Sequence, residues 1–128
     1  MPSLPKVILK LQKEKPVLAQ HPWIFSGAIK TVEGSFDAGD LVSVHNHAGQ
    51  FLAKGYINPD SQIMVRLLTF KDEEINADFF KKKIETALLL RKDWIPSETN
   101  AFRLIHSEGD FIPGLIVDQY DNFLVVQF

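Results

Sequence analysis

The sequence contains no cysteine, which excludes disulfide bonds, thiolate metal sites and cysteine nucleophiles from these 128 residues. It also lacks a long hydrophobic run, since no apolar stretch approaches the roughly 20 residues of a membrane-spanning helix. The start, Met-Pro-Ser-Leu-Pro-Lys, has no apolar core of a signal peptide. Apolar residues make up 45% and charged residues 23%, as in globular proteins. We therefore expect a soluble, cytoplasmic protein without a membrane partner.

The sequence also has no large excess of either sign of charge, because its formal net charge is only -2. Residues 1–70 hold seven Lys and Arg against five Asp and Glu, whereas residues 71–128 hold seven against eleven, so the two parts carry +2 and -4. A nucleic-acid partner would thus have to be bound by shape and a few phosphate contacts rather than by a strong positive field.

Short strand-like runs separated by turn residues fill the first 70 positions. The expected strands are Lys6–Gln12, Ile29–Glu33, Leu41–His45, Phe51–Ile57 and Ile63–Phe70. Lys13 to Pro16 should end the first strand. His21 to Ile29 should form a compact corner, and Pro22 is placed where it could start a short helical turn. Parallel neighbours need long crossover connections, so this spacing favours a small β-barrel.

The apolar period changes after residue 75. Asn76 can cap a helix that Pro96 ends, and its predicted apolar face holds Phe80, Ile84, Ala87, Leu88, Trp94 and Ile95. Further strands are expected at Phe102–His106, Gly114–Gln119 and Phe123–Phe128, with a tight turn at Asp121-Asn122. The last strand would present an open apolar edge, which natural sheets normally cover. We therefore expect an α+β domain that is incomplete within this chain.

Several segments, taken in order, resemble one enzyme family. They are His21-Pro-Trp-Ile-Phe-Ser-Gly-Ala-Ile29, Gly49-Gln-Phe-Leu-Ala-Lys-Gly-Tyr-Ile-Asn-Pro59, Ile63-Met-Val-Arg66, Leu90-Arg91 and Arg103 to Tyr120. Together they resemble the large-subunit ribosomal RNA cytosine-C5 methyltransferases, which combine a PUA domain, a central EEHEE-type domain and a Rossmann-like catalytic domain. The resemblance implies that residues 1–72 are the RNA-binding PUA domain. It also implies that residues 73–128 are the linking helix and the start of the central domain.

The same resemblance implies S-adenosylmethionine as cofactor of the full-length protein, structured RNA, in particular rRNA, as its partner, and a homodimer as its assembly. This chain has no glycine-rich strand-to-helix loop for that cofactor. Methylation at cytosine C5 also needs a thiolate that adds to C6, and no cysteine is present. We therefore expect no catalytic or cofactor-binding residue here, and the chain alone is no enzyme. The alternative is a self-contained PUA-like RNA-binding adaptor without catalysis.

Basic and aromatic residues of the first part form the candidate RNA-binding set, which comprises Trp23, Lys30, Lys54, Tyr56 and Arg66. Such cations can contact phosphates, and the rings can stack on unpaired bases. Strand alternation points Lys54 and Arg66 outward, where a solvated surface charge is the alternative. For Trp23 and Phe25 the sequence favours core positions over RNA contacts.

Two other polar clusters have plain structural explanations. His45-Asn46-His47 is followed by Ala48-Gly49, which indicates a hairpin turn, and no further ligands are spaced to complete a metal site. Lys81 to Lys83 is typical of a solvated helix face.

The segment from Arg103 to Tyr120 is a charged loop between two apolar runs. Its candidate residues are Arg103, Glu108, Asp110 and Asp118. Asp110 precedes Ile112-Pro113-Gly114 and suits an Asx-type turn, and the spacing does not separate an acid–base pair from local turn formation. The resemblance places the segment in a domain that faces the catalytic one, so shaping the RNA or cofactor cleft is the competing interpretation.

Overall fold

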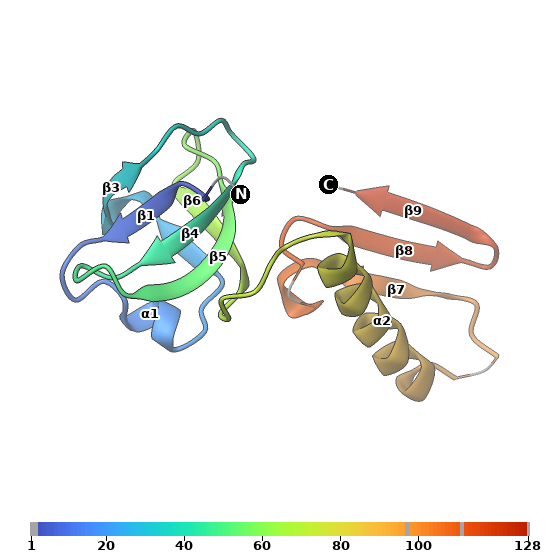
Figure 1. Cartoon of the computed structure of the whole chain (residues 1–128). Helices are drawn as coiled ribbons and strands as arrows, with labels where there is room; N and C mark the ends of the chain where they lie inside the picture. Colours follow the sequence, from blue (N-terminus) through green and yellow to red (C-terminus); the bar gives the residue numbers. More distant parts are fainter. Residues whose placement is uncertain (1–2, 97, 111, 128) are drawn as a thin grey trace. The chain divides into compact units, whose positions relative to one another are not determined.

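The computed structural model of the chain describes residues 3–96, 98–110 and 112–127 (Figure 1). It divides into two compact units, the first ending at Glu73 and the second beginning at Glu74. No helix in the described ranges has the length and apolarity to cross a membrane.

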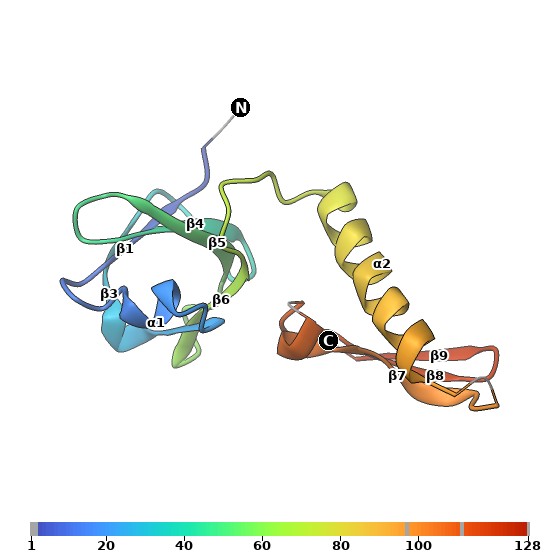
Figure 2. The same cartoon turned by 90° about the horizontal axis from the view of Figure 1, so that it is seen from below.

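The first unit is a six-stranded sheet that curls into a half-barrel (Figure 2). The strands are β1 (Lys6–Leu9), β2 (Trp23–Phe25), β3 (Ile29–Glu33), β4 (Leu41–His45), β5 (Phe51–Ile57) and β6 (Ile63–Thr69). Their order is β2-β6-β5-β4-β1-β3, and every neighbouring pair is antiparallel except β1 and β4. The predicted small β-barrel unit is thereby confirmed, with one parallel pair that the spacing did not predict.

Strand alternation builds the core of this unit. The fully buried side chains inside the curl are those of Val7, Leu9, Val42, Val44, Ala53, Ile57 and Val65. Gly55 stands between Ala53 and Ile57 in the inward row of β5, and a Cβ added there would overlap the carbonyl oxygen of Arg66. Only glycine lets β5 and β6 approach this closely.

Two short helical turns interrupt the strands. β1 ends at Leu9, and α1 (Lys15–Leu18) begins with Pro16 in its first turn. The proline that we expected to act only as a strand breaker thus opens a helix, because its fixed φ suits that position. The helical turn expected at Pro22 is wrong, because Trp23–Phe25 pair with β6 as the short strand β2, and the 3₁₀ turn η1 (Ser26–Ala28) follows only after it.

The second unit packs one long helix against a three-stranded antiparallel sheet in the order β7-β8-β9. Its elements are α2 (Ala77–Trp94), β7 (Ala101–His106), the 3₁₀ turn η2 (Ser107–Asp110), β8 (Ile116–Tyr120) and β9 (Phe123–Gln127). Asn76 caps α2 as predicted, since its Oδ1 accepts a hydrogen bond from the N–H of Phe79 at 2.9 Å. The core joins Ala87 to Leu104, Ile105, Ile112 and Val117.

The predicted apolar face of α2 is wrong at several positions. Phe79 is buried instead of Phe80, while Leu88 is 43% and Trp94 81% exposed. Of the helix, Ala87 and the partly buried Ile84 pack against the core that the sheet provides, so the sheet covers less of the helix surface than the apolar positions would fill. Tertiary contact, not periodicity, therefore selects the buried side of this helix.

β9 is an edge strand whose apolar side chains are exposed. Phe123, Leu124, Val125 and Val126 are between 45% and 74% exposed. The predicted open edge is therefore present over Phe123–Gln127, whereas Phe128 lies outside the described residues. A covering strand from a larger domain stays a prediction.

Candidate nucleic-acid interface

Three of the candidate RNA-binding residues form one row across the first unit. Trp23 on β2 lies opposite Arg66 on β6, which in turn lies opposite Tyr56 on β5. Residues directly opposite one another share a face of a sheet. The flanking Val65 and Leu67 are buried, so this row occupies the outward face. All three row residues are half-buried.

The row is ordered by ring contacts. The guanidinium carbon of Arg66 lies 5.7 Å from the centre of the Trp23 ring, a cation–π distance. Trp23 also meets His21 and Phe25 edge to face, with centroids 5.9 and 6.5 Å apart. The sequence brings these rings together because Trp23 and Phe25 alternate with Ile24, whose side chain takes the inward position at 3% exposure.

The predicted core positions of Trp23 and Phe25 are therefore wrong. Phe25 is 51% exposed and Trp23 is half-buried. β2 is a three-residue edge strand, and its pairing with β6 shifts register between Ile24 and Phe25. One inward side chain is all that such a strand places in the core.

A hollow of about 170 Å³ lies beside these rings. Its walls come from the turn before α1, from α1 itself and from β2 and η1, and its lining residues are Lys13, Pro16, Val17, His21, Trp23, Ile24, Phe25 and Ala28. This hollow was not predicted from the sequence, because the α1 helix that forms one wall was not predicted.

Lys54 points outward on β5, as alternation predicted, but it has protein partners. Its ammonium donates to the carbonyl oxygen of Glu73 at 2.9 Å and lies 3.2 Å from a carboxylate oxygen of Asp72. Thr69, opposite Lys54 on β6, donates to the Glu73 carboxylate at 2.8 Å. With 17% of its side chain exposed, Lys54 fastens the segment after β6 to the sheet.

Lys30 is exposed on β3, which pairs with β1 and not with the strands that carry the row. The structure therefore brings Trp23, Tyr56 and Arg66 together, but not Lys30.

The histidine pair at the β4–β5 connection forms a hairpin, as predicted. Asn46 Oδ1 accepts the N–H groups of Ala48 and Gln50 at 3.0 and 2.9 Å. The buried His45 ring is hydrogen-bonded to Ser43 Oγ at 2.9 Å. Among the described residues, no group of three or more His, Asp and Glu is placed to hold a metal ion.

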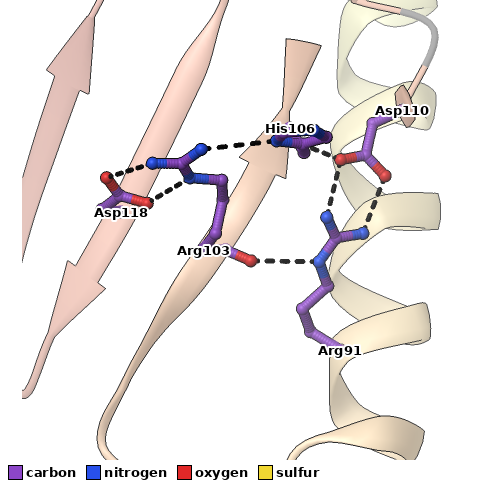
Figure 3. A network of polar contacts seen from close by, with 5 residues as sticks. All are labelled: Arg91, Arg103, His106, Asp110 and Asp118. Carbon is purple, nitrogen blue, oxygen red and sulfur yellow. Dashed lines mark hydrogen bonds and ion pairs between the residues drawn. The ribbon is translucent and has the colours of Figure 1, made fainter. Parts of the chain in front are cut away.

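A polar network in the second unit joins α2 to the strand β7 and the turn η2 (Figure 3). Arg91 donates from both terminal nitrogens to the two carboxylate oxygens of Asp110 at 2.7 Å, and its Nε donates to the carbonyl oxygen of Arg103 at 3.1 Å. Asp110 also accepts the backbone N–H of His106 at 2.6 Å. The Asp110 side chain is only 5% exposed. It therefore acts as a joint between three elements. The predicted Asx-type turn is not formed with Ile112, whose N–H donates to the carbonyl oxygen of Ser107 at 3.1 Å.

Arg103 and Asp118 form a second ion pair within this network. They lie opposite each other on β7 and β8, with Nε and Oδ1 2.8 Å apart, and Arg103 also approaches His106 Nδ1 at 3.4 Å. Glu108 lies in η2, the turn that ends at Asp110.

The two carboxylates of the network are held in their charged form. Burial alone would raise the pKa of Asp110, but hydrogen bonds from Arg91 and from the His106 N–H outweigh it and hold the pKa below its usual value. The hydrogen bond from Arg103 likewise lowers the pKa of Asp118. A carboxylate held in this way is a poor proton acceptor, so the geometry favours positioning over acid–base chemistry.

Known proteins place the first unit in a family. Residues 7–70 match the PUA-like domain family, and the chain therefore belongs to that family.

Relatives match almost the whole chain. It is 45% identical over 124 residues to the ribosomal RNA large subunit methyltransferase I of Alteromonas mediterranea. The aligned region covers 95% of this chain and 31% of that protein. The protein of the same name from Vibrio vulnificus is 45% identical over 116 residues, covering 90% and 29%, and that from Salmonella paratyphi C is 39% identical over 129 residues, covering 98% and 32%. The chain thus spans about a third of the length of these relatives.

Solved structures show the same fold at low identity. A putative SAM-dependent methyltransferase from Streptococcus mutans matches with a TM-score of 0.78 at 21% identity, over 94% of this chain and 32% of that one. A putative methyltransferase complexed with SAH matches with a TM-score of 0.79 at 21% identity, over 94% and 31%. At this identity, the likeness concerns the fold alone.

Proposed function

We propose that this chain is the RNA-docking N-terminal portion of a SAM-dependent methyltransferase that modifies large-subunit rRNA at cytosine C5, with the catalytic residues outside residues 1–128. The names of the relatives support rRNA methylation, and the family resemblance supports C5 of cytosine. The names of the relatives also favour this function over a self-contained RNA-binding adaptor. The observation that carries the docking role is the outward row of Trp23, Arg66 and Tyr56 on a PUA-like unit.

The row has the chemistry that structured RNA requires. A guanidinium can contact one phosphate through two parallel hydrogen bonds, and its stacking on Trp23 limits the side-chain freedom that binding would otherwise cost. The half-exposed rings of Trp23 and Tyr56 offer faces for unpaired bases. Lys54 stays a candidate at which a phosphate would have to compete with Asp72 and Glu73. Lys30 stays a candidate for a separate contact on β3.

The described parts of the chain do not form a site that fits S-adenosylmethionine. Nucleotide-type cofactors in α/β folds bind at the carboxyl ends of parallel strands, with an acidic side chain for the ribose. Of the described strand pairs only β1 and β4 are parallel. A second hollow, of about 380 Å³ beside Arg91 and Phe102, has no carboxylate in its lining, and neither has the hollow beside Trp23. We therefore derive no methyl-transfer step from this chain.

For the second unit we propose the start of the central α+β domain. The joint between Arg91 and Asp110 fixes the loop that follows β7, which supports a positioning role for this loop beside a cleft. Cleft shaping by Arg103, Glu108, Asp110 and Asp118, a homodimer and a cytoplasmic location all stay predictions.

Filter binding of an rRNA hairpin to the whole 128-residue chain at low ionic strength tests the docking role. We expect weak binding that Arg66→Glu reduces about tenfold, since a hydrogen bond to a charged group contributes about 1.5–3 kcal/mol. The matched control is Lys71→Glu, an exposed charge reversal in the same unit but outside the row. In the full-length protein, Arg66→Glu should raise the KM for rRNA and leave kcat unchanged. Wild-type chain that does not bind, or equal binding by Arg66→Glu, would refute the docking role.

A further inference from the structure

The positive charge of the first unit is concentrated in one segment. Residues 6–30 carry five lysines and a single acid, Glu14, a formal charge of +4. Residues 31–70 carry Lys54 and Arg66 against four acids, a formal charge of -2. The basic segment comprises β1, α1, β2 and η1, and residues 13–28 within it supply the whole lining of the hollow beside Trp23.

The hollow has the size and walls of a site for one ring system. Its volume of about 170 Å³ lies below the roughly 300–1,000 Å³ of pockets for drug-sized ligands. The buried side chains of Val17 and Ile24 line it, beside the aromatic rings of Trp23 and Phe25. Phe25 is 51% exposed, so it retains a large area for a further contact.

We propose that this hollow accommodates one unpaired nucleobase of the docked RNA, stacked against Trp23 and Phe25, while Lys13 faces its backbone phosphate. The inference rests on the proposed RNA-docking function and adds the feature of the RNA that is recognised. Aromatic walls within a segment of charge +4 match a ring joined to an anion better than an apolar protein side chain. Trp23 belongs both to the docking row and to the hollow, so a strand lying along the row would place a base here.

Two RNAs with the same phosphates separate base recognition from docking. One is an rRNA hairpin with a single-nucleotide bulge, and the other has an abasic residue in that bulge. We expect the abasic RNA to bind about tenfold more weakly, the effect of losing one base stacked on an aromatic ring. The background is Trp94→Phe, which leaves Trp23 as the sole tryptophan and replaces a side chain that is 81% exposed. The fluorescence of Trp23 should be quenched by the bulged RNA and much less by the abasic one.

Phe25→Leu keeps apolar volume in the wall but removes the ring. It should lower the ratio of the two affinities, because only the contact with Trp23 remains, without changing the affinity for the abasic RNA. Leu18→Ala is the matched control, because Leu18 is 67% exposed on α1, does not line the hollow and should leave the ratio unchanged. The affinity ratio and the fluorescence quenching can both be measured on the Trp94→Phe background. They therefore test the base site even if Phe25→Leu fails to fold.

Each result has a defined meaning. Equal binding of both RNAs with unchanged Trp23 fluorescence overturns the base site and leaves the docking row intact. Failure of both RNAs to bind overturns the docking function and the base site together. Trp23 emission that changes with protein concentration in the absence of RNA means that a second copy of the chain fills the hollow, which also overturns the base site.

Discussion

Replacing Asp110 with Asn removes one negative charge from a nearly buried position without changing the size of the side chain. Asp110 is 5% and Arg91 18% exposed, and the two share a bidentate contact. An asparagine retains one acceptor oxygen, and its amide group would face a nitrogen of Arg91 that also donates. The variant therefore leaves the guanidinium without a counter-ion at a site with little water.

The cost follows from this geometry. Breaking one side of a buried ion pair costs about 3–5 kcal/mol. Arg91 retains partial exposure and its hydrogen bond to the carbonyl oxygen of Arg103, so we expect the lower value, about 3 kcal/mol. Because the joint ties α2 to β7 and η2, the loss should fall on the second unit.

Amide hydrogen exchange measures this directly. A loss of about 3 kcal/mol should speed the exchange of opening-limited amides in α2 and β7 roughly 150-fold, while amides of the first unit serve as an internal reference. Asp121→Asn is the matched control, since Asp121 is exposed in the β8–β9 turn and asparagine tolerates its φ of 53°. Unchanged exchange of α2 and β7 in Asp110→Asn would contradict the assigned role.

Two other predictions concern each unit in turn. Gly55→Ala places a Cβ against the Arg66 carbonyl in a packed sheet, so it should destabilise the first unit by about 3 kcal/mol and lower its Tm by roughly 20 °C. Gly39→Ala, with an open neighbourhood, should show only the penalty of its positive φ. Equal melting curves would contradict the close approach of β5 and β6. The pKa values of Asp110 and Asp118 are lowered in the folded state, so their stabilisation is complete above the ordinary carboxyl pKa near 4 and is lost as the pH falls through the lowered values. The protection of second-unit amides, that is, their exchange rate relative to the intrinsic rate at the same pH, should therefore fall below about pH 4. It should fall less when both residues are Asn, which a pH series would detect.

The first unit was predictable where turn residues flank short β-rich runs. β3, β4 and β5 have the predicted bounds for this reason, although only β5 shows a regular alternation of buried and half-buried residues. α1 was missed because a four-residue helix has almost no periodicity. The exposure of Phe25 was missed as well, since it depends on a register shift that local sequence does not encode.

In the candidate sites, too, features that follow from local sequence were predicted and contacts between distant residues were not. The outward direction of Lys54 follows from strand alternation, but its partners Asp72 and Glu73 lie beyond the end of the sheet. Asp110 was identified as a turn residue, yet its main partner is Arg91, nineteen residues earlier on a helix. No local rule connects positions so far apart, because the contact exists only once α2 packs on β7.

The charge distribution of the first unit also determines how its RNA binding would respond to counterions. Each phosphate contacted releases condensed cations, so two contacts from Lys13 and Arg66 would cost roughly 7- to 12-fold in affinity when the salt concentration rises fourfold. A base stacked against Trp23 and Phe25 releases no counterions and is nearly indifferent to this change. The preference for an unpaired base would therefore persist at salt concentrations where most of the phosphate-driven affinity is lost.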